Sequence, residues 1–194
     1  MSNIFYDRAS KEIAYLKKTG QYKNLKSIIS PMGPSVKLKD KGEVDCFCSN
    51  NYLGLANHPE VVEAGVEGLR RYGAGTASVR FICGSFDCHN DIESKIASFL
   101  GKESAYTFVS CWTANEAFFP TLCSPDDLIL SDELNHACII DGIRLASQIQ
   151  KGIRRKVYKH CDLKDLEQKL SEAVTDCSFK GQIWIVTDGV FSME

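Results

Sequence analysis

The chain has 194 residues, of which 44% are hydrophobic, and it carries 23 Lys and Arg against 25 Asp and Glu. This length and composition predict one folded domain, with or without an appendage, and nothing in them suggests disorder. The net charge of −2, without long blocks of one sign, argues against binding to nucleic acid or to a membrane surface. No apolar run approaches the roughly 20 residues of a membrane span, and no targeting segment is predicted.

The nine cysteines are scattered, mostly in apolar surroundings. Their odd number and irregular spacing favour reduced thiols used as small core residues over a disulfide framework, which predicts a cytosolic protein. Cys46 with Cys48, and Cys88 with His89, are the closest approach to metal-ligand pairs. Neither has a second pair at zinc spacing, so no metal site is predicted.

Residues 1–48 are predicted to form an N-terminal arm and a hairpin. Residues 4–18 place apolar side chains on one helical face and charged side chains on the other. Residues 36–38 and 43–48 predict two short strands joined through Asp40-Lys41-Gly42. The arm is expected to pack on another domain or subunit, or else on its own core.

A helix is predicted over residues 59–72, beginning at a proline and turning its inward face toward a core. The residues of that face are Val61, Val62, Val66 and Leu69. Before it, Asn50 and Asn51 are turn formers, or they orient a carboxylate or a ring in a cleft.

The glycine-rich residues 73–78 do not match a dinucleotide-binding loop, because the third glycine is missing and the segment follows a helix. A nicotinamide dehydrogenase is therefore disfavoured. The long loop that continues to Ser85 is instead predicted to form a wall of a site or an interface.

From residue 89 onward, helices and strands are predicted to alternate. The expected helices are 89–100, 112–122, 136–147 and 163–173, and the expected strands are 105–109, 127–130, 156–158 and 183–187. Such units without hairpin signals predict an α/β fold with a mainly parallel sheet and helices on both faces.

Ligands of such sheets bind beyond the carboxyl ends of the strands, where three polar clusters are expected. They are Ser110-Cys111-Trp112, Asp132 to His136, and Asp188 to Ser192. In the first cluster a strand leads into a helix start, where Thr113 and Glu116 have the spacing of a capping box.

Free N–H groups at that helix start suit a phosphate, although an ordinary strand-to-helix turn has the same pattern. His136 is expected to project over the cleft or to cap a helix. A phosphate seat, an imidazole and a hydroxyl at adjacent strand ends indicate a phosphorylated cofactor with an aromatic ring.

Four ordered motifs span nearly the whole chain: residues 50–55, 77–84, 131–142 and 187–193. Together they resemble the α-oxoamine synthase family of pyridoxal-phosphate enzymes, and the resemblance implies an incomplete PLP-dependent transferase-like large domain over residues 49–194. The second and third motifs are most similar to the branch that interconverts glycine and acetyl-CoA with 2-amino-3-ketobutyrate and CoA, in threonine breakdown.

The resemblance implies pyridoxal 5'-phosphate as the cofactor. Ser110, Cys111 and Trp112 match the turn that holds its phosphate, with Trp112 standing where phenylalanine is usual. His136 matches the catalytic imidazole that stacks on the pyridine ring, and Ser192 matches a hydroxyl near the phenolic oxygen.

The resemblance also implies substrate contacts and a homodimer with shared active sites. Asn50 and Ser78 match positions near the substrate carboxylate, and His136 is also placed to hydrogen-bond the substrate.

The family's aspartate for the pyridine nitrogen, its Schiff-base lysine and its carboxylate-binding arginine would follow Glu194. None of Lys102, Lys151 and Lys180 stands in the lysine motif. We therefore expect the chain to be an N-terminal segment that cannot catalyse the reaction by itself. An 8-amino-7-oxononanoate or 5-aminolevulinate synthase, and a non-catalytic partner subunit that docks through the arm and residues 73–85, remain alternatives.

Overall fold

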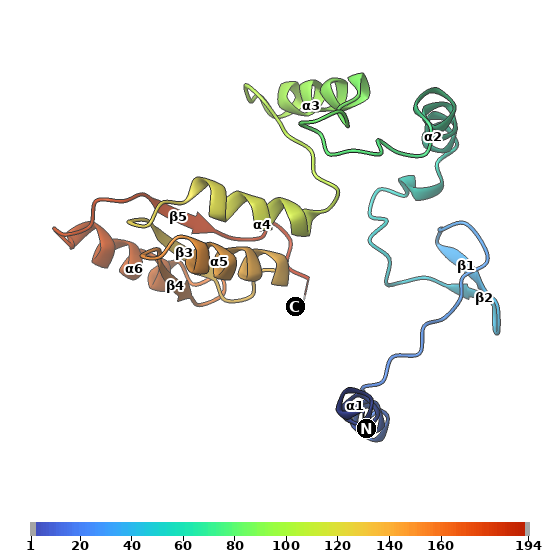
Figure 1. Ribbon diagram of the computed structural model, residues 1–194, viewed down its shortest axis with the longest axis horizontal. Coiled ribbons are helices and arrows are strands. Elements are labelled where there is room, and N and C mark those ends of the chain that lie inside the picture. The colour runs from blue at the N-terminus through green and yellow to red at the C-terminus, as the bar shows by residue number, and fades with distance from the viewer. Residues whose placement is uncertain (1–2, 193–194) are drawn as a thin grey trace. The chain divides into compact units, whose positions relative to one another are not determined.

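The computed structural model describes residues 3–192, and the chain forms two compact units, Met1–Ser85 and Phe86–Glu194. The first contains α1 (Ile4–Lys18), β1 (Ser35–Leu38), β2 (Gly42–Asp45), the 3-10 helix η1 (Leu55–Asn57) and α2 (Pro59–Tyr72) (Figure 1). The second contains α3 (Asp87–Leu100), α4 (Cys111–Leu122), β3 (Leu128–Asp132), α5 (Ala137–Ile149), β4 (Arg154–Tyr158), α6 (Leu163–Thr175) and β5 (Ile183–Val186). The domain boundary expected after residue 48 remains a prediction.

The hairpin of the first unit confirms the sequence prediction. β1 and β2 pair antiparallel, with Val36 opposite Val44. Ser35 Oγ donates to Asp45 Oδ1 over 2.7 Å and closes the open end of the ladder. At the other end Gly42 adopts a φ of 79°, which glycine reaches without steric cost.

The helices α1 and α2 lie where the sequence predicts them, but the expected burial of α2 is wrong. Its Val61 is 50% exposed and its Leu69 60% exposed, and none of its residues is buried. Local signals are enough to start and end such a helix, whereas burial requires an opposing apolar surface. No helix among residues 3–192 combines the length and apolar character that crossing a bilayer requires.

The second unit confirms the predicted parallel α/β fold. Its sheet has the strand order β4-β3-β5, and both neighbours run parallel to β3. The register places Leu128 beside Arg154 on one side and Ile183 on the other. Because β3 is central, all five of its residues are buried.

Helices cover both faces of this sheet (Figure 1). On one face, Ile129 packs with Phe119 of α4 and with Ile143 of α5. On the other face, Leu128 and Leu130 pack against Ala173 and its neighbours on α6. The alternation along β3 thus directs successive residues into two separate cores.

The strand expected over residues 105–109 is wrong. These residues form no strand, and Val109 is 96% exposed. A strand needs a neighbour to pair its backbone groups, and no neighbour is present among the described residues. The helix α3 ends at Leu100 as predicted and begins two residues earlier than predicted, and its Phe99 is 88% exposed.

Candidate active site at the carboxyl edge of the sheet

The helix α4 begins one residue earlier than predicted, and this changes its cap. Ser110 is the N-cap, and its Oγ accepts from the backbone N–H of Thr113 over 3.1 Å. Thr113 Oγ1 in return accepts from the N–H of Ser110 over 3.2 Å. The expected pairing of Thr113 with Glu116 is therefore wrong, and Glu116 accepts instead from Trp112 Nε1 over 2.9 Å.

This cap leaves donors at the start of α4. The N–H groups of Cys111 and Trp112 have no hydrogen-bond partner within the described part of the chain. Both belong to the first helical turn, where the helix dipole favours an anion. Two such donors side by side suit an anion such as a phosphate.

The ring of His136 lies beside this helix start. Its centroid is 6.4 Å from that of Trp112, with the two ring planes at 82°. His136 is also the N-cap of α5, because its Nδ1 accepts from the N–H of Cys138 over 3.2 Å. An accepting Nδ1 requires the tautomer in which Nε2 carries the proton, so the ring presents a donor on its other edge.

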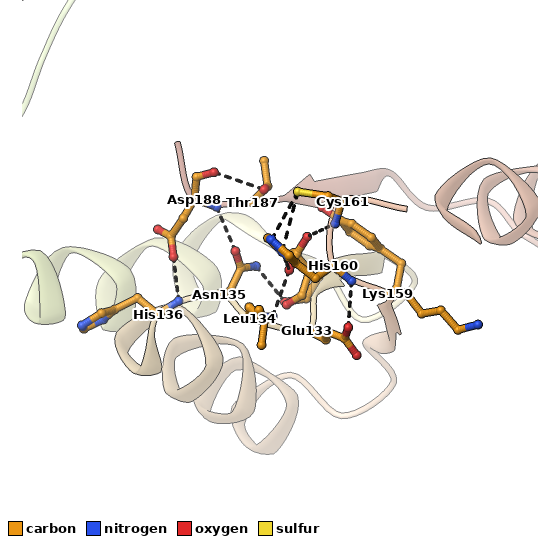
Figure 2. A network of polar contacts seen from close by, with 12 residues as sticks. Glu133, Leu134, Asn135, His136, Lys159, His160, Cys161, Thr187 and Asp188 are labelled. Carbon is orange, nitrogen blue, oxygen red and sulfur yellow. Dashed lines mark hydrogen bonds and ion pairs between the residues drawn. The ribbon is translucent and has the colours of Figure 1, made fainter. Parts of the chain in front are cut away.

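A hydrogen-bonded chain fixes the backbone of His136 (Figure 2). Its N–H donates to Asp188 Oδ2 over 2.7 Å, and the N–H of Asp188 donates to Asn135 Oδ1 over 2.9 Å. Asn135 is 4% exposed, and its amide donates to Ser131 Oγ and to the carbonyl of Val186. The loops after β3 and β5 are thereby tied to each other.

A second link joins the starts of α4 and α5. Asn115 Nδ2 donates to the carbonyl of Cys111 over 3.1 Å and to Cys138 Sγ over 3.2 Å. Burial raises the pKa of the Cys138 thiol, which keeps that thiol protonated. Asn115 therefore ties the start of α4 to the first turn of α5, the helix that His136 caps.

The sequence did not single out Asn115, Asn135 or Cys138. Asn135 directly precedes His136 in a polar cluster after a strand, and that position was the available signal. Asn115 carries no comparable signal, since its partners lie on another helix.

Three further residues were predicted for the site, Ser192 in the second unit and Asn50 and Ser78 in the first. Ser192 is exposed beyond β5. Asn50 and Ser78 belong to the first unit, where Asn50 Oδ1 accepts from Tyr52 Oη over 3.5 Å and Ser78 lies in a tight loop. Their roles at an active site remain predictions. For Asn51 the turn-former interpretation fits, because its Oδ1 accepts from the N–H of Ala56 over 3.0 Å.

Comparison with known proteins identifies the family and the fold of the chain. Residues 44–194 match the family model for aminotransferases of class I and II. The human mitochondrial 2-amino-3-ketobutyrate coenzyme A ligase is 44% identical over 94% of this chain and 42% of the relative, and 8-amino-7-oxononanoate synthase 1 of Bacillus velezensis is 42% identical over 94% and 44%. A serine palmitoyltransferase from S. paucimobilis, solved with a bound PLP-myriocin aldimine, superposes with a TM-score of 0.81 at 25% identity over 100% of this chain and 46% of that one.

The chain thus spans less than half the length of these relatives. The match to α-oxoamine synthases recognised from the four motifs is confirmed by the identities over nearly the whole chain. The chain belongs to the class I and II aminotransferase family.

Proposed function

We propose that the protein carrying this chain is a PLP-dependent acyltransferase that interconverts glycine and acetyl-CoA with 2-amino-3-ketobutyrate and CoA, a step of threonine breakdown. The name of the human relative, which is 44% identical, supports this choice of reaction. The present chain would contribute the phosphate seat and the stacking imidazole. We place the protein in the cytosol, where free thiols are stable, although the human relative is named as mitochondrial.

The observation that carries the proposal is the juxtaposition of the α4 start with the ring of His136. Two unpaired N–H groups fit a phosphate dianion, and Ser110 fits as the residue that opens the turn. The flat face of His136, held 6.4 Å from Trp112, fits a planar heterocycle. When bound there, PLP supplies an electron sink for charge at the α-carbon of glycine.

His136 has two tasks in this proposal. The hydrogen bond from Cys138 N–H to Nδ1 fixes the orientation of the ring, so the cofactor would meet a preorganised surface. Its Nε2 proton is then available to an oxygen of the substrate or of the thioester. Both tasks require the same orientation of the ring.

Three further residues enter the proposal on motif position. Ser192 would lie near the phenolic oxygen of the cofactor. Asn50 and Ser78 would lie near the substrate carboxylate, since amide and hydroxyl donors suit a carboxylate.

We also propose a homodimer with shared active sites. The first unit leaves large apolar side chains uncovered, among them Phe5 of α1 at 61% exposure and Phe81 at 88%. Exposed apolar surface of this kind is typical of protein interfaces. A second copy of the chain would cover it.

The second candidate is another synthase of the same family. The Bacillus velezensis 8-amino-7-oxononanoate synthase is 42% identical to this chain, almost the same as the human ligase. The two candidates differ in the acyl thioester and in the amino acid that they accept. Thioester preference is therefore the property that separates them.

The test is an assay of CoA release by the purified PLP-loaded protein with glycine and each of a series of acyl-CoA thioesters. We expect acetyl-CoA to be preferred, and a preference for a long dicarboxylic acyl thioester would favour the second candidate. His136→Ala is expected to lower turnover by about a hundredfold, while PLP absorbance shows retained cofactor because backbone groups hold the phosphate. Unchanged turnover in this variant would rule out the assigned role of His136.

A further inference from the structure

A second chemical cluster lies at the carboxyl ends of β3 and β4, apart from the residues assigned to PLP. Cys161 Sγ is 3.3 Å from His160 Nε2, and His160 Nδ1 is 3.0 Å from Asp132 Oδ1. Figure 2 shows the thiol, the imidazole and the end of β3 side by side. The order is thiol, imidazole, carboxylate.

Asp132 determines which nitrogen of His160 can accept a proton. Its side chain is 2% exposed, and although burial opposes ionisation, hydrogen bonds from Leu134 N–H, His160 and Cys161 N–H lower the pKa of this carboxyl. An ionised carboxylate only accepts, so Nδ1 of His160 must carry the proton. Nε2 is then the acceptor that faces the thiol of Cys161.

Other contacts hold the imidazole in place. The backbone N–H of His160 donates to Glu133 Oε1 over 2.9 Å, and the imidazole ring packs edge-on against Phe191 with centroids 4.3 Å apart. The His160 side chain is 17% exposed. Its position is therefore set by contacts on several sides.

The backbone of Cys161 is held in an unusual conformation. Its φ is 52°, in the left-handed region that residues other than glycine seldom adopt. The residue is exposed to solvent. This turn brings the sulfur against the base and leaves it open to a reagent from solution.

We propose that Cys161 is a nucleophilic thiol with His160 as its base, and that it is a site of oxidation by small hydroperoxides. The sulfur attacks one peroxide oxygen, so that an S–O bond forms and the O–O bond breaks, and the thiol proton moves to His160 Nε2. The leaving hydroxide, or the alkoxide where the peroxide carries an alkyl group, takes that proton and departs as water or as an alcohol. The thiol is oxidised by two electrons to a sulfenic acid, and the peroxide is reduced by two.

None of these side chains belongs to the residues proposed to bind PLP. His160 Nε2, 3.3 Å from the sulfur, is placed to take the thiol proton as the sulfur attacks, which is how a neighbouring base activates a cysteine nucleophile. A rate about tenfold above that of an unassisted exposed thiol is the expected result.

The test compares thiols within the full 194-residue chain. The reduced protein is treated with limiting hydrogen peroxide at neutral pH, the remaining thiols are capped with iodoacetamide, and each cysteine is quantified by mass spectrometry. Cys177 is the internal reference, because it is also exposed and, within residues 3–192, its thiol donates only to a backbone carbonyl, that of Thr175. We expect Cys161 to be oxidised about tenfold faster than Cys177. Equal rates would overturn the proposal without any substitution being needed.

Two variants identify the base. His160→Gln keeps a polar side chain but cannot take the proton at neutral pH, and it is expected to bring Cys161 to the rate of Cys177. Glu133→Gln is the matched control, since it removes the neighbouring charge while the amide oxygen can still accept from the backbone N–H of His160, and Cys161 should stay within about twofold of its original rate. An undiminished rate for Cys161 in His160→Gln would contradict the proposal.

Folding of each variant is read in the same experiment. Cys123 and Cys138 are 3% exposed, and burial, assisted by Asp127, raises the pKa of Cys123 to about 11. Both thiols are expected to resist oxidation and capping in a folded chain. If these two thiols react in a variant, that variant is not folded. The comparison of Cys161 with Cys177 in the unsubstituted protein then tests the proposal.

Discussion

The two compact units differ in how far they cover their own apolar side chains. In the described part of the first unit, residues 3–85, only Val36 and Gly84 are buried. In the second unit a sheet strand with Ile129 and Leu130 at 0% exposure is covered on both faces. Yet the helices of both units begin and end close to where the sequence predicts.

The difference separates the local signals that start and end a helix from the tertiary packing that buries its apolar face. Proline at the start of α2 and glycine after it act locally, and they need no tertiary partner. The apolar stripe of the same helix indicates a burial that the first unit does not supply by itself. Most helical stability in proteins comes from such packing, so the two units should respond differently to the same kind of substitution.

The largest difference is expected for truncation of an apolar side chain. Ile129→Ala should lower the free energy of unfolding of the second unit by about 3 kcal/mol, because it opens a cavity in a closed core. Leu69→Ala in α2 should change stability by about 0.5 kcal/mol or less, since Leu69 is already 60% exposed.

Urea titration measures the first effect through tryptophan fluorescence, because both tryptophans, Trp112 and Trp184, belong to the second unit. Far-UV circular dichroism follows the helices of the first unit. Equal losses for the two variants would mean that Leu69 is buried in solution, as it would be in a tight dimer.

Opposite signs are expected for two helical glycines. A Cβ on Gly142 of α5 would lie 2.6 Å from the carbonyl oxygen of Asn115, so Gly142→Ala should force α4 and α5 apart and cost about 2 kcal/mol. A Cβ on Gly65 of α2 would meet no atom within 4 Å, so Gly65→Ala should stabilise α2 by up to about 1 kcal/mol. Thermal unfolding of each variant, followed by fluorescence and by circular dichroism, gives both signs. Destabilisation by Gly65→Ala would again place a partner against α2.

Acid should weaken the second unit through Asp127. This carboxyl is 3% exposed, and although burial raises its pKa, hydrogen bonds from Ser124 N–H, Gln182 N–H and Trp184 Nε1 outweigh it and lower the pKa. A pKa lower in the folded than in the unfolded chain gives stability that is complete above the unfolded value of about 4. That stability is lost as the pH falls through the folded value.

Asp127→Asn should remove this pH dependence and cost about 1 to 2 kcal/mol at neutral pH, since an amide accepts with one oxygen only. The measurement is urea unfolding at a series of pH values, followed by tryptophan fluorescence. A variant that keeps the full acid sensitivity of the original chain would show that Asp127 is not its source.

The sequence predicted the parallel sheet because strand and helix periods alternate over short distances. It also placed Ser110 to Trp112 and His136 at strand ends. Trp112 and His136 do lie together in the second unit, although no strand precedes Ser110. The strand expected at residues 105–109 does not form. Its residues are apolar and aromatic, but a strand depends on a neighbour that no local pattern reveals.

The polar links of the site could not be predicted for a related reason. The bond between Asn135 and Asp188 joins residues 53 positions apart, and either residue alone resembles an ordinary turn residue. The capping pair at α4 lies three residues earlier than predicted, since both Ser110 and Thr113 are good caps and only the start of the helix decides between them.

The smallest effect is expected at the phosphate seat, and it tests whether the backbone of the second unit holds the cofactor. Cys111→Ser should change PLP affinity by about twofold or less, because in the proposed site the N–H group at the first position of α4, and not the thiol, binds the phosphate. Cys111→Pro removes that N–H at the first position of α4, where proline suits the helix and the extended Ser110 accommodates it. Losing one hydrogen bond to a charged group should lower PLP affinity by about tenfold. Titration of the apoprotein with PLP, followed by cofactor absorbance, compares the two variants, and an equal loss in both would assign the contact to the side chain.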